Sequence, residues 1–238
     1  MSDSLVIIPT YNEKENIEKI IRKVFSLPKV FHILIIEDNS PDGTAAIIKK
    51  LMKEFNGRLF IEERKGKLGL GTAYIHGFRW ALQKNYSYIF EMDADFSHNP
   101  DDLVRLYEAC HTQGADLAIG SRYTRGGKVK NWPLSRILMS YFASVYARLI
   151  LWFNVSDTTA GFKCYKSKVL QRIHLDDIKF TGYAFQIEMK YTAHKLGFKI
   201  VEVPITFIDR QEGVSKMSTK IFKEAFFGVL QMRFKKIK

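Results

Sequence analysis

The sequence predicts an α/β fold with a mostly parallel, mixed sheet flanked by helices, within one chain of 238 residues. Short aliphatic runs alternate with segments of helical periodicity through the first half of the chain, which is typical of βα units around a parallel sheet. Acidic and other polar residues collect where these runs end, which is where open α/β sheets bind ligands. The length suits a single domain with a sizeable buried core.

The first half contains five aliphatic runs that we expect to form strands, at residues 5–8, 32–36, 59–62, 88–92 and 117–119. A helix is expected after the first run because apolar residues recur at i, i+3, i+4, i+7 and i+8, namely at Ile17, Ile20, Ile21, Val24 and Phe25. Asn12 and Glu15 resemble a capping box at its start. Similar spacing predicts a helix over 47–55, and Asn99 is the expected N-cap of a helix that ends near Cys110.

Residues 137–153 form an apolar run whose length approaches that of a membrane span. Its polar residues are spaced by four and continue a line from Arg136, so they form one polar stripe: Ser140, Ser144 and Arg148. This stripe favours a helix that lies in the membrane interface or packs beside the site over one that spans the bilayer.

A second amphipathic helix is expected over 222–233, beside several lysines. Each Lys or Arg near an anionic leaflet contributes on the order of 1 kcal/mol, so such a cluster is able to hold a protein at a bilayer. Core packing explains the apolar face of this segment equally well, and the sequence does not choose between them.

The composition excludes several classes of protein. Cys110 and Cys164 lack metal-ligand spacing, which argues against a structural zinc or disulfide framework and fits a reducing cytoplasm. The N-terminus has no pattern typical of a signal peptide. A formal net charge of +12 predicts an anionic partner, whether nucleic acid, a phosphate-bearing small molecule or a membrane surface.

The most informative short motif is Asp93-Ala94-Asp95, directly after the fourth aliphatic run. Two carboxylates this close repel unless a cation lies between them, and Mg²⁺ or Mn²⁺ binds such oxygens together with substrate phosphates. The alternative is a pair of solvated turn acids, but the position after a buried strand favours a metal and diphosphate site.

Two other strand ends carry candidate nucleoside contacts. Tyr11 and Glu13, in the segment 9–13, offer an aromatic ring and a carboxylate for a base, although Asn12 is also explained as a helix cap. Residues 41–43 (Pro-Asp-Gly) are expected to form a turn, while Asp38 is the better candidate for a ribose or base contact. The glycines over 66–71 do not fit a dinucleotide fingerprint, and we expect 65–71 to be a flexible loop at the substrate edge.

Basic residues in the second half are candidate phosphate ligands. Arg122, Arg136 and Arg210 offer guanidinium groups for bidentate contacts, and Lys216 adds a point charge. Each alone is more often a surface residue, but with a metal site they suit two anionic substrates.

Seven motifs in this order resemble the dolichol- or polyprenol-phosphate mannose synthases. They are PTYNE at 9–13, EDNSPDGT at 37–44, DADFSHNP at 93–100, GSRY at 120–123, GGKVKNWPLSR at 126–136, DTTAGF at 157–162 and R-x-x-G-x-S-K ending at Lys216. The resemblance covers nearly the whole chain. It implies a GT-A fold, GDP-mannose as donor with Mg²⁺ or Mn²⁺, dolichyl or polyprenyl phosphate as acceptor, and inversion at the anomeric carbon.

The resemblance also implies roles for individual residues. Those assigned to the donor are Pro9, Tyr11, Glu13, Ile36, Asp38, Asp93, Ala94, Asp95, Arg210 and Lys216. Asp93 and Asp95 would hold the metal, with Ser97 as a third candidate where some relatives carry glutamine. Ser121, Arg122 and Arg136 would bind the acceptor phosphate, so Asp93, Asp95, Arg122 and Arg136 form the expected catalytic set.

The same resemblance divides the chain into a nucleotide-sugar half (1–123), an acceptor half (124–216) and a C-terminal amphipathic helix (217–238), all within one domain. It implies a peripheral enzyme at the cytoplasmic face of a membrane, allows a small membrane-protein partner and gives no role to nucleic acid. A phosphomonoester has a second pKa of about 6 and is already ionised at neutral pH, so no general base is expected. Arginines and a metal would instead bring two anions together.

Two alternatives stay open at this point. The same chemistry with UDP-glucose or a UDP-N-acetylhexosamine fits the short motifs, which are shared widely. A basic protein that binds nucleic acid or membranes without catalysis fits the charge, but it does not explain acids gathered at strand ends.

Overall fold

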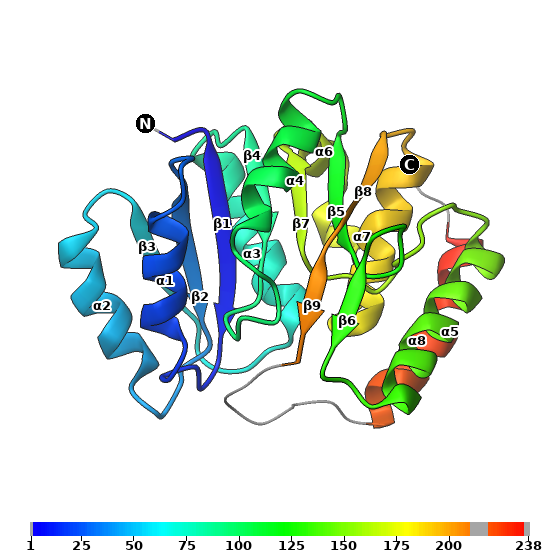
Figure 1. The fold of residues 1–238 in the computed structure, drawn as a ribbon, viewed down its shortest axis with the longest axis horizontal. Coiled ribbons are helices and arrows are strands. Elements are labelled where there is room, and N and C mark those ends of the chain that lie inside the picture. The colour runs from blue at the N-terminus through cyan, green and yellow to red at the C-terminus, as the bar shows by residue number, and fades with distance from the viewer. Residues whose placement is uncertain (1, 210–218, 236–238) are drawn as a thin grey trace.

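The computed structural model describes residues 2–209 and 219–235, which form a three-layer α/β arrangement around one central sheet (Figure 1). The seven strands of the sheet lie in the order β3-β2-β1-β4-β7-β5-β8. They are β1 (Ser4–Thr10), β2 (His32–Glu37), β3 (Leu59–Glu63), β4 (Tyr88–Glu91), β5 (Leu117–Ser121), β7 (Lys163–Lys166) and β8 (Ile200–Pro204). Only β7 is antiparallel to its neighbours β4 and β5, so the mixed, mostly parallel sheet predicted from the sequence is confirmed.

Helices cover both faces of the sheet. Side chains of α1 (Ile17–Phe25), α2 (Thr44–Glu54) and α4 (Asp102–His111) pack on the face formed by Val6, Ile8 and Ile33. The opposite face packs against α3 (Leu70–Gln83), α6 (Ser167–Arg172) and α7 (Tyr183–Lys195), with a short 3₁₀ helix at Leu175–Asp177. Strands buried on both faces are rich in β-branched and aliphatic residues, as β1 and β2 are here.

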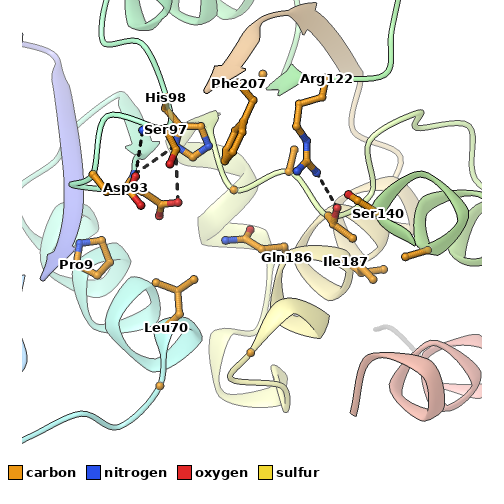
Figure 2. Close-up of a pocket in the computed structure, with 18 of the residues that line it drawn as sticks. Pro9, Leu70, Asp93, Ser97, His98, Arg122, Ser140, Gln186, Ile187 and Phe207 are labelled. Carbon is orange, nitrogen blue, oxygen red and sulfur yellow. Dashed lines mark hydrogen bonds and ion pairs between the residues drawn. The ribbon is translucent and has the colours of Figure 1, made fainter. Parts of the chain in front are cut away.

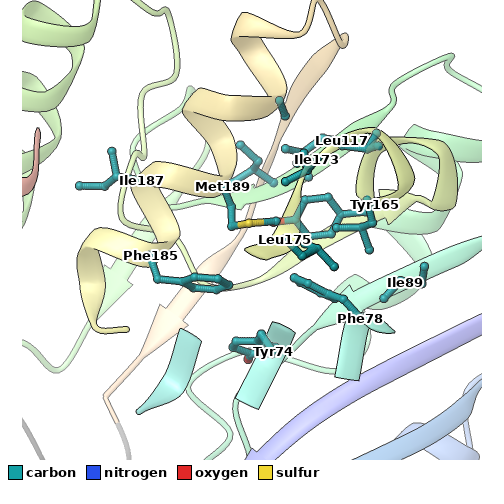
Figure 3. Packing of buried hydrophobic residues seen from close by; sticks show 14 of the residues in the cluster. Tyr74, Phe78, Ile89, Leu117, Tyr165, Ile173, Leu175, Phe185, Ile187 and Met189 are labelled. Atoms are coloured by element: carbon teal, nitrogen blue, oxygen red, sulfur yellow. The ribbon is translucent and has the colours of Figure 1, made fainter. Parts of the chain in front are cut away.

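Large aromatic side chains fill the second face (Figure 3). Tyr74 of α3 stacks on Phe185 of α7 with ring centroids 6.1 Å apart, and the ring of Phe78 meets that of Tyr165 edge-on. These rings are fully buried and anchor α3 and α7 beneath the carboxyl ends of β1 and β4. A rigid floor for ligand binding follows from this packing.

Two further helices lie side by side beyond β8 (Figure 1). They are α5 (Leu134–Leu151) and α8 (Thr219–Phe234), joined by a stacked pair of rings, Tyr146 and Phe226, with centroids 4.8 Å apart. The Tyr146 hydroxyl also donates a hydrogen bond to the Phe226 carbonyl. A small parallel pair, β6 (Lys128–Lys130) and β9 (Thr206–Ile208), lies between these helices and the main sheet.

Three local predictions need correction. Asn12 is not a helix cap: its backbone has φ of +56°, its N–H donates to the Ser40 hydroxyl, and α1 begins only at Ile17. The helix expected from Asn99 begins at Asp102, although the Asn99 side chain does accept the backbone N–H of Asp101. The loop expected over 65–71 ends at Gly69, because α3 starts at Leu70.

Candidate active site

A cleft of about 940 Å³ opens along the carboxyl ends of β1, β4 and β5 and is bounded on the far side by α5 and α8. Ten of the residues predicted from the sequence line it: Pro9, Tyr11, Glu13, Asp38, Asp93, Ala94, Asp95, Ser97, Arg122 and Arg136. Their distribution gives the cleft an acidic end near β4 and a basic end near β5 and α5 (Figure 2).

The end of the cleft near β1 and β2 is built around Asp38. Both oxygens of its carboxylate are held by the Arg64 guanidinium, with Nε–Oδ1 at 2.6 Å and Nη2–Oδ2 at 2.7 Å. Thr72 of α3 accepts a third hydrogen bond from Arg64. The ring of Tyr11 lies close by, with the Lys67 ammonium 5.3 Å from its centroid. A carboxylate and an aromatic ring that line the same cleft suit a nucleobase.

The acidic end is a turn formed by residues 93–98. The Asp95 side chain accepts the backbone N–H of Ser97 at 3.1 Å, and Phe96 adopts a left-handed conformation with φ of +58°. Asp93 is more open to the cleft, with 39% of its side chain exposed. The turn therefore presents one ordered and one accessible carboxylate to the same space.

The donor set of this turn fits a hard divalent ion. Two carboxylates and the Ser97 hydroxyl are oxygen ligands, and Mg²⁺ commonly takes one or two protein carboxylates and completes its coordination with phosphates and water. No cluster of three or more His, Cys, Asp or Glu side chains suited to a metal occurs among the described residues. Phosphate oxygens and water are the ligands that would complete such a set.

His98 supports this turn from below. Its ring is 3% exposed, stacks on Phe162 at 4.9 Å and accepts the backbone N–H of Asp93 at a long 3.4 Å. Burial, reinforced by the positive charge of Arg122, lowers the pKa of His98 to about 4, although Asp95 acts in the opposite direction. The imidazole is consequently neutral at physiological pH and serves as a packed support.

Arg122 dominates the basic end. Its guanidinium pairs with Asp157, which is fully buried, through Nε–Oδ2 at 2.7 Å and Nη2–Oδ1 at 2.6 Å, and Nη2 also donates to the Thr159 hydroxyl. Aromatic rings of Trp132 and Phe207 lie 5.5 and 5.4 Å from the guanidinium carbon. The arginine is thus fixed in position before any ligand arrives.

Arg136 enters the same end from the first turn of α5. Its guanidinium pairs with Asp209 at 3.0 Å and lies 4.0 Å from the centre of the Trp132 ring. Ser140, one turn further along α5, also lines the cleft, and Ser144 beyond it is fully buried. Arg136 and Ser140, at the start of the predicted polar stripe, therefore line the cleft, while Arg148 at its far end donates a hydrogen bond to Asn154 instead.

Large apolar side chains on α5 and α8 are exposed instead. We call the following set the apolar surface: Leu134, Leu138, Met139, Tyr141, Phe142, Leu149, Trp152, Phe226, Phe227 and Phe234. Within the described ranges, α5 alone is long and apolar enough to cross a membrane, yet only 17% of it is buried within the protein. Four members of this surface, Met139, Phe142, Phe226 and Phe227, also line the cleft, so the apolar surface is continuous with the rim of the cleft.

Two predicted residues that the structure describes, Ile36 and Ser121, do not line the cleft. Ile36 lies within β2, and its side chain is fully buried in the core. Ser121 is also fully buried, and its hydroxyl accepts the backbone N–H groups of Tyr123 and Thr124, which shapes the turn that follows β5. Arg210 and Lys216 lie outside the described residues.

The structure adds residues that the sequence did not single out. Asp157, Arg64 and Asp209 each hold a side chain that had been predicted. Gln186 of α7 lies in the floor of the cleft. The DTTAGF motif was the only available signal for Asp157, and no pattern marked the other three.

Comparison with known proteins assigns this chain to a family. Residues 5–173 match the model of "Glycosyl transferase family 2". The chain is 47% identical over 228 residues to the polyprenol monophosphomannose synthase of Mycolicibacterium smegmatis, covering 96% of this chain and 86% of that protein. It is 45% identical over 225 residues to the undecaprenyl-phosphate mannosyltransferase of Micrococcus luteus, covering 94% and 91%.

Solved structures share the fold at low identity. Glucosyl-3-phosphoglycerate synthase from Mycobacterium tuberculosis, solved with Mn²⁺, UDP and phosphoglyceric acid, superposes with a TM-score of 0.71 at 16% identity, covering 97% of this chain and 78% of that one. A mannosyltransferase from Pyrobaculum calidifontis in complex with GDP-Man and Mn²⁺ gives 0.60 at 13% identity, covering 97% and 69%. The predicted GT-A fold is thereby confirmed.

Proposed function

Since the chain belongs to glycosyl transferase family 2, we propose that it transfers mannose from GDP-mannose to the phosphate of a polyprenol such as dolichol, with inversion of the anomeric carbon. One observation carries the proposal: a single cleft has a carboxylate turn at one end and two ordered arginines at the other. The two named relatives, both at 45% identity or more over nearly the full chain, support mannose and a polyprenyl phosphate as substrates.

The donor would lie along the β1, β2 and β4 ends. Asp38 and Tyr11 would contact the nucleoside, while Asp93 and Asp95, with Ser97, would hold Mg²⁺ or Mn²⁺ against the diphosphate. A divalent ion at this place neutralises the charge that develops on the departing nucleoside diphosphate. The Mn²⁺ in the two structural neighbours supports a divalent ion without choosing between the metals.

The acceptor phosphate would lie between Arg122 and Arg136, with Ser140 close by. These residues need only bind and orient it, because a phosphomonoester oxygen is already an anionic nucleophile at neutral pH. Attack from the arginine end, opposite the leaving diphosphate, inverts the anomeric carbon.

The apolar surface supports a position at the membrane interface. A polyprenyl chain is insoluble, so its phosphate must be met at the bilayer. Exposed leucines and aromatic rings on α5 and α8 would enter the headgroup region, and Arg136 and Ser140 line the cleft beside Met139 and Phe142 of this surface. The resulting product would be a β-mannosyl phosphopolyprenol released into the same leaflet.

The test is a transfer assay with the purified full chain, a short polyprenyl phosphate in detergent and a choice of GDP-mannose, UDP-glucose or UDP-N-acetylglucosamine. We expect mannosyl lipid only from GDP-mannose, and only with Mg²⁺ or Mn²⁺. Transfer from a UDP-sugar instead would contradict the proposed donor.

Asp95→Asn should lower turnover at least 100-fold, since a metal ligand is lost. Asp101→Asn is the matched control, because Asp101 pairs with Lys23 at the surface outside the cleft. Equal turnover in the two variants would overturn the metal role.

A further inference from the structure

The floor of the cleft contains a buried polar network that the proposed chemistry leaves without a role. It consists of Glu91 at the end of β4, Lys163 and Tyr165 of β7, and Gln186 of α7. Glu91 and Lys163 are completely buried, and Gln186 is 2% exposed. A buried ion pair is expensive in solvation and often fails to stabilise a fold, so its presence beneath a ligand site indicates a geometric purpose.

The network fixes the orientation of the Gln186 amide. Its Nε2 donates to Glu91 Oε2 at 3.0 Å, and its Oε1 accepts from the Lys163 ammonium. The opposite rotamer of the amide would place its oxygen against a carboxylate and its nitrogen against an ammonium group. The charges of Glu91 and Lys163 therefore determine which way the amide points.

Glu91 and Lys163 are themselves held in place. Glu91 Oε1 accepts hydrogen bonds from the Tyr165 hydroxyl at 2.9 Å and pairs with the Lys163 ammonium at 3.0 Å. Tyr165 belongs to the buried aromatic core of α3 and α7, so one side of the network rests on packed rings. A preorganised group of this kind needs no rearrangement to act on a ligand.

One amide hydrogen of Gln186 is left for a ligand. A glutamine amide offers two N–H donors, and Glu91 takes one of them. Within residues 2–209 and 219–235, the structure gives Nε2 no second acceptor, and Gln186 lines the cleft. Figure 2 shows its amide between Asp93 on the acidic side and Arg122 and Ser140 on the basic side.

This position is where the transferred sugar has to be. The sugar is bonded to the diphosphate at the start and to the acceptor phosphate at the end, so it must lie between the carboxylate turn and the two arginines. Gly161 forms the adjacent floor, since a Cβ there would lie 3.6 Å from Gln186 Nε2 and 3.8 Å from His98 Cε1. A glycine leaves the Gln186 amide uncovered.

We propose that Gln186 is a specificity residue that donates a hydrogen bond to a hydroxyl of the donor hexose, with Glu91 and Lys163 as its positioning residues. This inference rests on the proposed function and adds a sugar contact to it. It predicts that Gln186 distinguishes a nucleotide sugar from the bare nucleotide, which residues of the nucleoside and metal sites do not do.

The experiment compares the affinities of GDP and GDP-mannose, each with Mn²⁺, for the wild type and Gln186→Met. Methionine keeps the length of the side chain but has no N–H. Loss of one hydrogen bond should lower the affinity for GDP-mannose about three- to tenfold and leave the affinity for GDP within twofold of the wild type. Gln113→Met, at an exposed glutamine outside the cleft, should change neither.

A second variant covers the case in which Gln186→Met does not fold. Gly161→Ala adds a methyl group that makes only ordinary contacts, so the fold should accept it while the methyl covers the Gln186 amide. We expect the same pattern: weaker binding of GDP-mannose and unchanged binding of GDP.

The role of Gln186 would be overturned if either variant bound both ligands more weakly to the same extent, or if neither affinity changed. A set of GDP-deoxymannoses sharpens the result, because the variant should lose the wild type's discrimination against only one of them. If the wild type binds a UDP-sugar instead of GDP-mannose, the donor assignment fails by itself, and the same pair of measurements with UDP and that UDP-sugar still decides the Gln186 proposal.

Discussion

Asp157 holds Arg122 at three points. Its carboxylate accepts the Nε and Nη2 groups of the side chain and also the backbone N–H of Arg122, at 2.9 Å. Asp157 is oriented in turn by Glu202 of β8, whose carboxylate accepts the backbone N–H groups of Ser156 and Asp157 at 2.8 and 3.0 Å. The end of β5 and the DTTAGF segment are therefore joined around one guanidinium group.

Asp157→Asn should impair the acceptor side of the reaction. The amide cannot accept from Arg122 as a carboxylate does, so the guanidinium loses its fixed direction and is left partly unpaired. We expect kcat/KM for polyprenyl phosphate to fall at least tenfold while the affinity for GDP with Mn²⁺ stays within threefold. The free energy of unfolding should fall by about 3–5 kcal/mol, as is usual when one partner of a buried pair is removed.

Asp176→Asn provides the control for this change. Asp176 also pairs with an arginine, Arg79, but its side chain is 92% exposed. Neither kinetics nor stability should change, because exposed pairs contribute little. An acceptor kcat/KM in Asp157→Asn equal to that of the control would show that Arg122 does not depend on Asp157.

The pair also predicts how stability depends on pH. Burial alone would raise the pKa of Asp157, but the charge of Arg122 and its hydrogen bonds outweigh burial and hold the pKa below the ordinary value of 3.8. A carboxylate with a lowered pKa in the folded state stabilises the fold fully above its unfolded pKa and loses this contribution as pH falls through the folded pKa. Urea unfolding between pH 5 and 2.5 should therefore show a shallower acid decline in Asp157→Asn than in the wild type. If the free energy of unfolding fell equally steeply with pH in both proteins, this prediction would be wrong.

Arg64→Lys should weaken nucleotide binding. Lysine keeps the positive charge but cannot hold both Asp38 oxygens, so the carboxylate loses the orientation that two bonds of 2.6 and 2.7 Å now give it. We expect the Kd of GDP with Mn²⁺ to rise about tenfold by isothermal titration calorimetry. Arg79→Lys, at an arginine that is half exposed, should bind GDP as the wild type does. Unaltered binding in Arg64→Lys would remove Asp38 from the nucleoside site.

The apolar surface makes a prediction about membranes. Leu134 and Leu149 are 70% and 68% exposed and do not line the cleft. Burying a leucine in an apolar medium contributes about 1.5–3 kcal/mol, so changing both to glutamate should lower the fraction that co-sediments with anionic vesicles at least tenfold. Transfer to a short acceptor in detergent should be unaffected. Val30→Glu, at another exposed apolar residue, is the control and should sediment normally.

Much of the fold was predictable because local pattern and tertiary environment agree. All five aliphatic runs became β1 to β5, and the reason is clearest for β1 and β2, because strands buried on both faces must be apolar along their length. The strand β7 was missed for the opposite reason: it reads Lys-Cys-Tyr-Lys, and its first lysine is fully buried only because Glu91 pairs with it across the sheet. Such a strand has no signature of its own.

The candidate site also has a part that the sequence predicts and a part that it does not. Residues at strand ends were predicted because the topology brings all of those ends to one edge. The side chain of Ile36 is buried because the residue before Glu37 points to the core of a doubly covered sheet, so its predicted donor contact stays a prediction. Gln186 was missed because its partner Glu91 lies 95 residues away, and the hydrogen bond between them has no local trace in the sequence.

The antiparallel strand β7 determines the distance between two strands that lead to the cleft. It lies between β4 and β5, so the strand that leads to the carboxylate turn and the strand that leads to Arg122 are second neighbours in the sheet. Adjacent strands are about 4.8 Å apart, which makes this separation about 10 Å. Direct neighbours would leave half of that. Under the proposed function, one inserted antiparallel strand would leave room for a single sugar ring between the donor diphosphate and the acceptor phosphate.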